Sequence, residues 1–401
     1  MAAAGRERRC VRGAVAVLLL VAASAPAAAA AADGFITWDD LSIQGAAAVA
    51  APRGVSDGRG GVKARARARL DLETIVVAQD GTGHSRTVQG AVDMVPAGNR
   101  RRVKILVRPG VYREKVTVPI TKPFVSLIGM GTGRTVITWN ARAADIDPSG
   151  HQVGTFYSAS VAVEADYFCA SHITFENSAP AAPPGAVGQQ AVALRLSGDK
   201  TMLYRCRVLG TQDTLFDNIG RHYLYNCDIQ GSIDFIFGNA RSLYQLSSPS
   251  GNDSDAPLLV LAPPRALIVA AKSQGCTLHA VATGYGAIAA SQRSSPAEDS
   301  GFSFVGCRLT GSGTLYLGRA WGRYARVVYS YCDLSGIVLP QGWSDWGDRS
   351  RTKTVLFGEY SCKGPGASTR QRVPWSRALT YEEARPFLGR SFINGEQWLR
   401  L

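Results

Sequence analysis

The sequence predicts an all-β solenoid, a fold in which short strands recur on successive coils and stack on their counterparts. A cysteine-marked segment recurs along the chain, and no long stretch shows uninterrupted helical periodicity. Glycine is frequent, with 43 among 401 residues, which favours many short strands and turns over long elements. We therefore expect one large solenoid domain with short helices only at its ends.

The repeat consists of an aromatic residue, a cysteine, a charged residue and an aliphatic residue, and it closes with a glycine. It reads YRCRVLG, YNCDIQG, FVGCRLTG and YCDLSG along the chain. Cys206 and Cys227 lie 21 residues apart, and Cys307 and Cys332 lie 25 apart, a period that suits one coil of a solenoid. Because stacked strands lie about 4.8 Å apart, we expect these cysteines to form a column inside the solenoid.

Two more cysteines, Cys169 and Cys276, are expected to belong to the same column. The thiols can stay reduced or form disulfides between adjacent coils, and secretion permits either state. No CxxC pair occurs and the five histidines are scattered, so the sequence predicts no metal site.

A short helix is expected at each end of the domain. Segment 87–95 (TVQGAVDMV) spaces its apolar residues as one helical face, which can plug the amino-terminal end of the coil. Near the carboxyl terminus, Thr380 is followed three residues later by Glu383, a pattern typical of the capping box that starts a helix.

The chain divides into three regions. Residues 1–32 are basic, then apolar, then small, the order typical of a secretory signal peptide. An uncleaved membrane anchor is the alternative, because the alanines around Pro26 can lengthen the apolar run. Residues 33–70 are a basic low-complexity linker, and residues 71–401 form the solenoid domain. We expect a secreted, extracellular protein without stable membrane association.

The formal net charge is +13, which attracts polyanions. In an extracellular matrix these are acidic polysaccharides, and nucleic acid is the rival partner. The sequence contains no nucleic-acid-binding module motif, so no nucleic-acid partner is expected. We expect the protein to be a monomer.

One segment interrupts the repeat. Cys227 and Cys276 lie 49 residues apart, and removing residues 246–274 restores a spacing of 20. The segment is polar and turn-rich, then apolar, and its length is unusual for a loop in a compact fold. It is either a genuine flap or sequence that the mature transcript lacks, and it contains a glycosylation sequon at Asn252.

Two aspartates occupy equivalent places in adjacent repeats. Aligned on their glycines, GTQDTLF and GSIDFIFG place Asp213 and Asp234 in the same position, 21 residues apart. Stacked carboxylates repel unless one is protonated or a cation intervenes, and such a costly arrangement suggests catalytic use. The alternative is that each aspartate merely caps a turn. Paired acids perform acyl transfer, with one as nucleophile, or glycoside hydrolysis, with both flanking a sugar bond.

Four further residues bear on the choice between acyl transfer and glycoside hydrolysis. The amides of Gln190 and Gln212 are uncharged donors suited to a developing oxyanion. Arg319 can keep a carboxylate ionised, and Trp321 offers a flat face to a sugar ring.

Seven segments stand in a fixed order within residues 70–401: GVYREKV, GTF, QAVALR, GTQDTLF, GSIDFIFGNA, YLGRAWG and GW. Together they resemble the plant-type pectinesterases, also called pectin methylesterases. The resemblance implies a right-handed parallel β-helix and a reaction without metal or cofactor. The implied substrate is methyl-esterified pectin (homogalacturonan), and the implied location is the cell wall.

The resemblance also implies a role for each matching residue. Asp234 would attack the ester carbonyl of galacturonate, and Asp213 would protonate the departing methanol and then take a proton from water. Gln190 and Gln212 match oxyanion-stabilising glutamines, and Arg319 matches the arginine that holds the nucleophile.

Other matched positions contact substrate or differ from the family pattern. Thr155, Gln190, Arg319, Trp321 and Trp343 are the expected substrate-binding residues. Glu114 lies within a motif but is expected to be structural, and Ala320 stands where many members have proline.

Two other functions remain to be separated from esterase activity. One alternative is a polysaccharide hydrolase or lyase, which can use the same scaffold. A hydrolase should lack the paired glutamines, and a lyase should carry an acidic cluster and a basic catalytic residue. A catalytically inactive, pectin-binding wall protein is the second alternative, because the interruption follows the coil of Asp234 directly.

Overall fold

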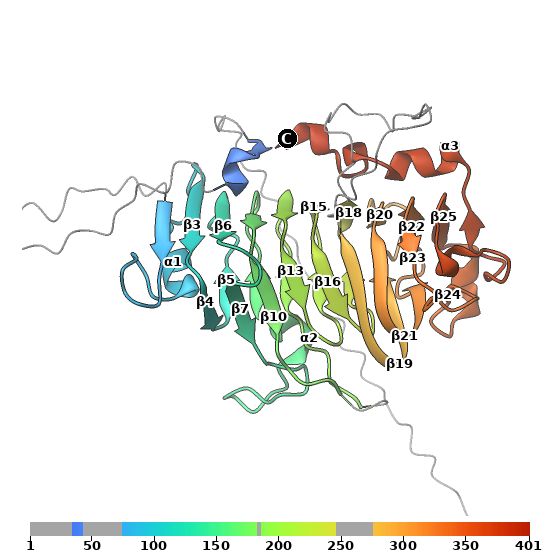
Figure 1. Cartoon of the computed structure of the whole chain (residues 1–401), viewed down its shortest axis with the longest axis horizontal. Coiled ribbons are helices and arrows are strands. Elements are labelled where there is room, and N and C mark those ends of the chain that lie inside the picture. The colour runs from blue at the N-terminus through green and yellow to red at the C-terminus, as the bar shows by residue number, and fades with distance from the viewer. Residues whose placement is uncertain (1–33, 43–73, 183–185, 246–275) are drawn as a thin grey trace, which may run out of the picture. The chain divides into compact units, whose positions relative to one another are not determined.

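The computed structural model describes residues 34–42, 74–182, 186–245 and 276–401, drawn in colour in Figure 1. These residues belong to one compact unit, Gly34–Leu401. The predicted signal peptide and the interruption with Asn252 lie outside the described residues, as does most of the predicted linker. No helix in the described ranges is both long and apolar enough to cross a membrane.

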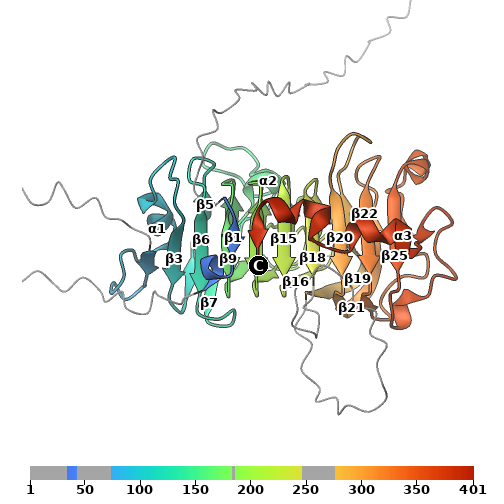
Figure 2. The same cartoon turned by 90° about the horizontal axis from the view of Figure 1, so that it is seen from above.

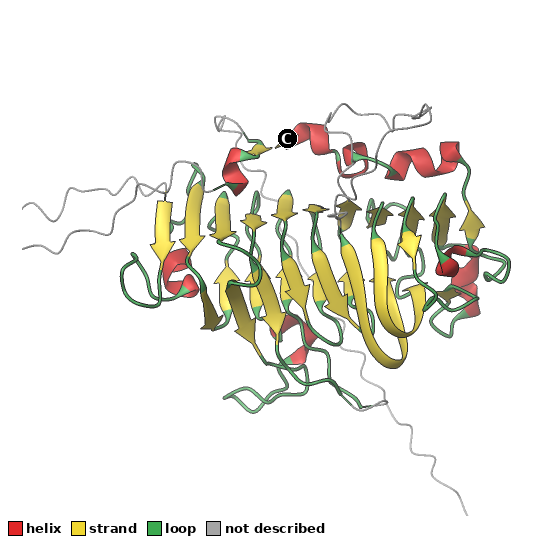
Figure 3. Ribbon diagram, viewed as in Figure 1, coloured by secondary structure: helices red, strands yellow, loops and turns green. Residues whose placement is uncertain are grey.

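The unit is a right-handed parallel β-helix, as the sequence predicted, and Figure 3 shows its strands stacked side by side. Eleven strands form the first sheet, all joined in parallel. They are β2 (Thr74–Val77), β3 (Val103–Val107), β6 (Val125–Gly129), β9 (Cys169–Ser171), β12 (Thr201–Tyr204), β15 (Arg221–Tyr225), β18 (Arg241–Gln245), β20 (Gly301–Val305), β22 (Arg326–Ser330), β25 (Leu356–Tyr360) and β26 (Arg377–Ala378).

The second sheet has fourteen strands in two rows, so each full coil contributes three strands. The first row is β4 (Gly110–Arg113), β7 (Thr135–Trp139), β10 (Thr174–Asn177), β13 (Arg207–Leu209) and β16 (Asp228–Gly231). The second row is β5 (Val116–Val118), β8 (Val161–Val163), β11 (Leu194–Leu196), β14 (Leu215–Asp217) and β17 (Ile236–Gly238). Two long strands, β19 (Thr277–Ser291) and β21 (Arg308–Arg319), continue both rows, and the short β23 (Asp333–Leu334) and β24 (Trp343–Ser344) pair with β21.

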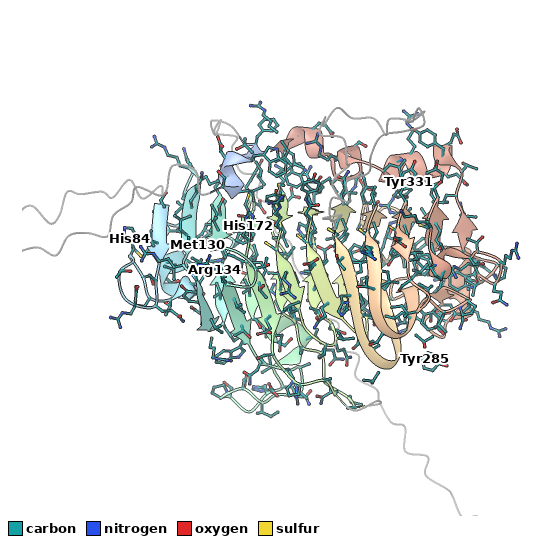
Figure 4. All side chains as sticks on the ribbon, viewed as in Figure 1. His84, Met130, Arg134, His172, Tyr285 and Tyr331 are labelled. Atoms are coloured by element: carbon teal, nitrogen blue, oxygen red, sulfur yellow. The ribbon has the colours of Figure 1, made fainter. Side chains whose placement is uncertain are left out.

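The long strands bend where the two rows meet. The register of β19 against β21 shifts between Val281 and Tyr285, and Tyr285 projects into solvent at this bend (Figure 4). Beyond the bend, Ala289 pairs with Ile236 of β17, which brings both long strands into the row that carries the predicted site.

A column of six cysteines runs through the core, each directly before a strand or bridge of the first row. The column contains Cys206, Cys227, Cys276, Cys307, Cys332 and Cys362. Successive members contact the coil before them, as where the Cys276 thiol donates to the carbonyl of Leu224 at 3.4 Å. All seven described cysteines carry free thiols.

The prediction for Cys169 was wrong. Cys169 lies on β9, pairs with Met202, and packs in an apolar cluster separate from the core column. In the equivalent place before β10 stands Ile173, and Cys362 continues the column at the other end.

Helix α1 (Val88–Met94) begins where the sequence predicted and buries Val88, Ala91 and Val92 against the first coil. The side chain of Thr87 accepts a hydrogen bond from the backbone of Gly90 and so caps the helix. Glu114 accepts from the backbone N–H groups of Val88 and Gln89 at 2.8 and 2.9 Å. Its position at the positive end of the helix agrees with the structural role expected for it.

The carboxyl-terminal strap, residues 379–401, runs back along the outer face of the first sheet (Figures 1 and 2). It contains α3 (Tyr381–Ala384), which has the predicted capping box between Thr380 and Glu383. Three short turns follow, η5 (Arg385–Phe387), η6 (Arg390–Ile393) and η7 (Gly395–Gln397), and then β27 (Leu399–Arg400) pairs with β1 (Ile36–Thr37). The remaining helical segments are η1 (Asp39–Leu41), α2 (Gly154–Tyr157), η3 (Arg349–Lys353) and η4 (Pro365–Ala367).

Candidate active site

Asp213 and Asp234 lie on adjacent coils in equivalent positions. Gln212 bridges to Ile233 in parallel, and the backbone N–H of Asp213 donates to the carbonyl of Ile233 at 3.1 Å. Both aspartates have positive φ, 58° and 45°, a conformation that costs energy for residues other than glycine. The same strained turn therefore precedes β14 and β17, and it stacks the two carboxyl groups as the repeat predicted.

Arg319, the last residue of β21, reaches across to Asp234. Its Nε donates to Oδ1 at 2.8 Å and its Nη2 donates to Oδ2, so the guanidinium engages both carboxylate oxygens. Asp234 is 6% exposed, and a bidentate arginine fixes the orientation of such a buried carboxylate as well as its charge.

The two carboxyl groups differ in their affinity for a proton. Burial raises the pKa of Asp234, and Arg319 opposes that rise. Burial together with the neighbouring charge of Asp234 raises the pKa of Asp213 well above its usual range, with only partial relief from Arg319. Asp234 therefore ionises first, while Asp213 keeps its proton to higher pH.

The two glutamines occupy the coil of Asp213 and the coil before it. Gln212 precedes Asp213 directly, and its side chain hydrogen-bonds the Asp213 carboxyl, which partly offsets the rise in the pKa of Asp213. The carbonyl of Gln212 accepts from the backbone of Ala191, which places Gln190 beside the same turn. Gln190 is half-buried, and its own carbonyl accepts from Ala143.

An apolar floor lies beside the carboxyl groups on the same face. Phe216 and Phe237 stack with ring centroids 4.4 Å apart, and Trp321 continues the row 6.1 Å from Phe237. Phe216 and Phe237 belong to a cluster of buried apolar residues, in which they are 8% and 4% exposed and which also contains Ala159, Ala162, Val192 and Ala290. Trp321 is half-buried and packs against this cluster, so its ring is the part of the row that can meet the flat apolar face of a sugar.

Thr155 lies on α2 at the other end of this floor, followed by Phe156, whose ring stands 6.1 Å from Phe216. The guanidinium of Arg195 packs over the Phe156 ring at 3.7 Å, and Glu164 binds Arg195 at 2.8 Å. Arg195 is buried and Glu164 is partly exposed, and their ion pair supports α2 at the edge of the floor.

The prediction for Trp343 was wrong. Its side chain is 1% exposed and packs in the core against Tyr329 and Phe357, so no sugar can reach it. Trp346, three residues later, lies over the guanidinium of Arg319 at 3.9 Å instead. Strand alternation turns Trp343 inward, whereas Trp346 follows in a turn with a positive φ of 63°.

Sequence reasoning also missed Phe156, Phe216 and Phe237. Phe216 and Phe237 follow the two aspartates at the same offset, so the repeat that aligned the acids also aligned these rings. Within the described ranges, no three His, Cys, Asp or Glu side chains gather as potential ligands of a metal ion.

A parallel β-helix that stacks two carboxyl groups, one of them held by arginine, beside a row of aromatic rings indicates the class of carbohydrate-active enzymes. The sequence model of the family described as pectinesterase matches residues 74–250 and 267–396. The chain therefore belongs to the pectinesterase family, whose members are carboxylic ester hydrolases.

Curated relatives and solved structures agree with this assignment. Pectinesterase QRT1 of Arabidopsis thaliana is 48% identical over 92% of this chain and 90% of its own length. Probable pectinesterase 8 of the same plant is 42% identical over 82% of this chain and 78% of its own length. The solved pectin methylesterase from carrot is 31% identical, with a TM-score of 0.68 over 86% of this chain and 96% of that one. A pectin methylesterase from Aspergillus niger, 24% identical with a TM-score of 0.63, shares the fold.

Proposed function

We propose that this protein hydrolyses the methyl esters of galacturonate units in pectin, with Asp234 as nucleophile and Asp213 as acid and base. The observation that carries the proposal is the difference between the two carboxyl groups. Arg319 binds both oxygens of Asp234, while burial and the charge of Asp234 raise the pKa of Asp213. Asp234 is thus supplied as a carboxylate and Asp213 as an acid.

In the first half of the reaction, a carboxylate oxygen of Asp234 attacks the ester carbonyl carbon. Negative charge develops on the carbonyl oxygen, and the amides of Gln190 and Gln212 are the donors that can stabilise it. The bond to the methoxy oxygen then breaks, and Asp213 gives that oxygen its proton, so methanol leaves and the galacturonate stays bound to Asp234 as an anhydride.

In the second half, Asp213 is a carboxylate and accepts a proton from water. The resulting hydroxide attacks the acyl carbon, and the bond to Asp234 breaks to leave galacturonic acid, whose carboxyl group then releases its proton to solvent and becomes a carboxylate. Asp213 holds the proton again and Asp234 is free, so both groups return to their starting states.

The substrate is proposed to lie along the aromatic floor. Thr155, Gln190, Arg319 and Trp321 are the proposed contacts, and the nearly buried Phe216 and Phe237 continue the row between Phe156 and Trp321. Two of the solved pectin methylesterase structures with this fold contain a hexasaccharide. We do not propose Trp343 as a contact, because it is buried.

We also propose that the protein is secreted to the cell wall as a monomer and modifies pectin there. Residues 1–32 have the pattern of a signal peptide, and the net charge of +13 favours retention on acidic wall polysaccharides.

The mechanism is tested by methanol release from methylated pectin. Asp234→Asn should abolish release while circular dichroism and melting temperature stay near those of the wild type, because an amide cannot act as the nucleophile. Asp213→Ala should lower kcat by at least about 100-fold, because the departing methoxide would lack its acid. Near-normal turnover in Asp234→Asn would refute the nucleophile, and new reducing ends without methanol would indicate a glycoside hydrolase.

A further inference from the structure

Arg351 binds the backbone immediately after Arg319. Its Nη1 donates to the carbonyl of Ala320 and, at 2.8 Å, to the carbonyl of Trp321. Arg351 belongs to η3, about thirty residues further along the chain, so the contact ties two separate segments together. A guanidinium that donates to two successive carbonyls fixes the direction of the peptide planes between them.

Arg351 is itself held in place. The carboxylate of Asp348 accepts from its Nε at 3.2 Å, and the same carboxylate caps η3 by accepting from the backbone of Ser350. At the other end of η3, the hydroxyl of Thr354 donates to the carbonyl of Arg323. Segment 348–354 is therefore fixed against the turn that begins at Ala320.

The turn at Ala320 joins two groups of the proposed site. Arg319 on one side binds Asp234, and Trp321 on the other side extends the aromatic floor. Ala320 has only a methyl side chain, and its backbone N–H donates to the carbonyl of Ser344 at 2.9 Å. The side chain of Arg351 thus supplies two of the bonds that set the angle between the guanidinium and the indole.

We propose that Arg351 is a positioning residue for ester hydrolysis, which holds Arg319 against Asp234 and Trp321 on the aromatic floor. The proposal rests on the mechanism proposed above, because it assumes that Asp234 is the nucleophile. Arg351 contacts the backbone and not the substrate, so it acts only through Arg319 and Trp321.

Loosening the turn at Ala320 should change the pH profile of the reaction. Asp234 faces Arg319 and the carboxyl group of Asp213, and Arg319 faces both aspartates and Tyr316. Arg351 faces Asp348. Because Arg319 opposes the rise in the pKa of Asp234, loosening its turn lets that pKa rise further, and the acid limb of kcat/KM moves to higher pH. A merely structural role would lower the melting temperature and leave that limb in place.

The test compares Arg351→Gln, Arg351→Lys and Arg349→Gln in the full chain, with methanol release measured across pH. Arg349 is an exposed arginine of the same η3, so its variant controls for loss of charge and for effects on the helix. Arg351→Gln should lower kcat/KM about tenfold at neutral pH and move the acid limb upward. Arg351→Lys retains a donor but not the planar guanidinium, so its kcat/KM and its acid limb should lie between those of Arg351→Gln and the wild type. Arg349→Gln should match the wild type in both.

Wild-type kcat/KM and an unmoved acid limb in folded Arg351→Gln would overturn the proposal. If Arg351→Gln does not fold, the test uses Arg351→Lys, and a wild-type kcat/KM with an unmoved acid limb in that variant would also overturn the proposal. Asp234→Asn, measured in the same assay, separates the two hypotheses. Retained activity in Asp234→Asn overturns the mechanism itself, whereas its inactivity beside a wild-type Arg351→Gln overturns only the role of Arg351.

Discussion

At the scale of single residues, one arginine makes two similar aspartates different. Asp213 and Asp234 share a strained backbone and adjacent coils, yet Arg319 hydrogen-bonds only Asp234. The guanidinium compensates the charge of one buried carboxylate, and that charge then disfavours ionisation of the other. The proposed division into nucleophile and acid therefore depends on a side chain from a different strand.

This dependence gives a prediction for Arg319→Gln. Without the guanidinium, the pKa of Asp234 rises and its orientation is lost, so kcat should fall about 100-fold and the acid limb of the pH profile should move upward. Methanol release and its pH dependence measure both effects. Arg326→Gln, a second half-buried arginine that contacts Asp299 far from the carboxyl pair, should leave the pH profile unchanged. An unchanged acid limb in Arg319→Gln would mean that the arginine does not set the charge of Asp234.

At the level of residues, the repeat predicts the acid pair but not the arginine that binds Asp234. A repeat of 21 residues aligns Asp213 with Asp234 because a β-helix stacks equivalent positions, and the same logic covers Phe216 and Phe237. Arg319 is 85 residues from Asp234 and belongs to a differently spaced coil, so its charge made it a candidate and only the family resemblance paired it with the nucleophile. The error at Trp343 arose because a two-residue motif does not state which side of the strand faces the core.

At the scale of elements, β14 joins the site to a buried polar network. Asp213 precedes this strand and Asp217 ends it, with its side chain inside the solenoid. His222 on β15 lies 2.5 Å from one oxygen of Asp217, and Tyr244 on β18 donates to the other at 2.5 Å. The Nε2 of His222 faces the carbonyl of Gly198 at 2.9 Å. A carbonyl only accepts, so Nε2 carries a hydrogen, while Nδ1 faces the Asp217 carboxyl group.

The network predicts a loss of stability at alkaline pH. Burial alone would lower the pKa of His222, but the charge and hydrogen bond of Asp217 outweigh it and the net shift is upward, with Asp199 adding to it. A raised pKa in the folded state contributes stability that is complete below the unfolded value, about 6.5, and is lost as pH rises through the folded value. The free energy of unfolding in urea should therefore fall between neutral pH and the raised pKa.

His222→Gln should be less stable by about 3 kcal/mol near pH 6, because the fully buried carboxyl group of Asp217 would lose its imidazole partner. This variant should also lose the alkaline decline. His279→Gln is the matched control, since that half-buried ring bonds only the Thr310 hydroxyl, and its alkaline decline should equal that of the wild type. An alkaline decline that persists unchanged in His222→Gln would contradict this origin.

At the scale of elements, the sequence predicted regular positions better than exceptions to the repeat. Helix α1 and the capping box of α3 follow from local patterns, because apolar spacing and caps are decided within a few residues. Cys169 was placed in the column although its neighbours lack the glycine that closes the repeat. Cys362 was left out because Lys363 and Gly364 follow it without the aliphatic residue of the repeat.

At the scale of the whole molecule, the ends of the described chain close over the first sheet while the site occupies the second. Trp398 of the strap is fully buried, and its Nε1 donates to the carbonyl of Ile393 at 3.0 Å. Ser303 of β20 donates to the carbonyl of Phe387 at 2.6 Å, so the strap bonds directly to the solenoid wall. In a solenoid, each coil contacts mainly its neighbours, and a strap across many coils adds contacts between distant parts of the chain.

The strap should therefore govern stability rather than chemistry. Trp398→Ala removes a fully buried ring and should lower the free energy of unfolding by about 3 to 5 kcal/mol, measured in urea. Trp139→Ala, at a ring that is 37% exposed, is the matched control and should change stability by less than about 1 kcal/mol. Because Asp213 and Asp234 lie on the other sheet, kcat of the folded Trp398→Ala enzyme should equal that of the wild type at low temperature. A large drop in kcat without unfolding would mean that the strap and the site are coupled through the core.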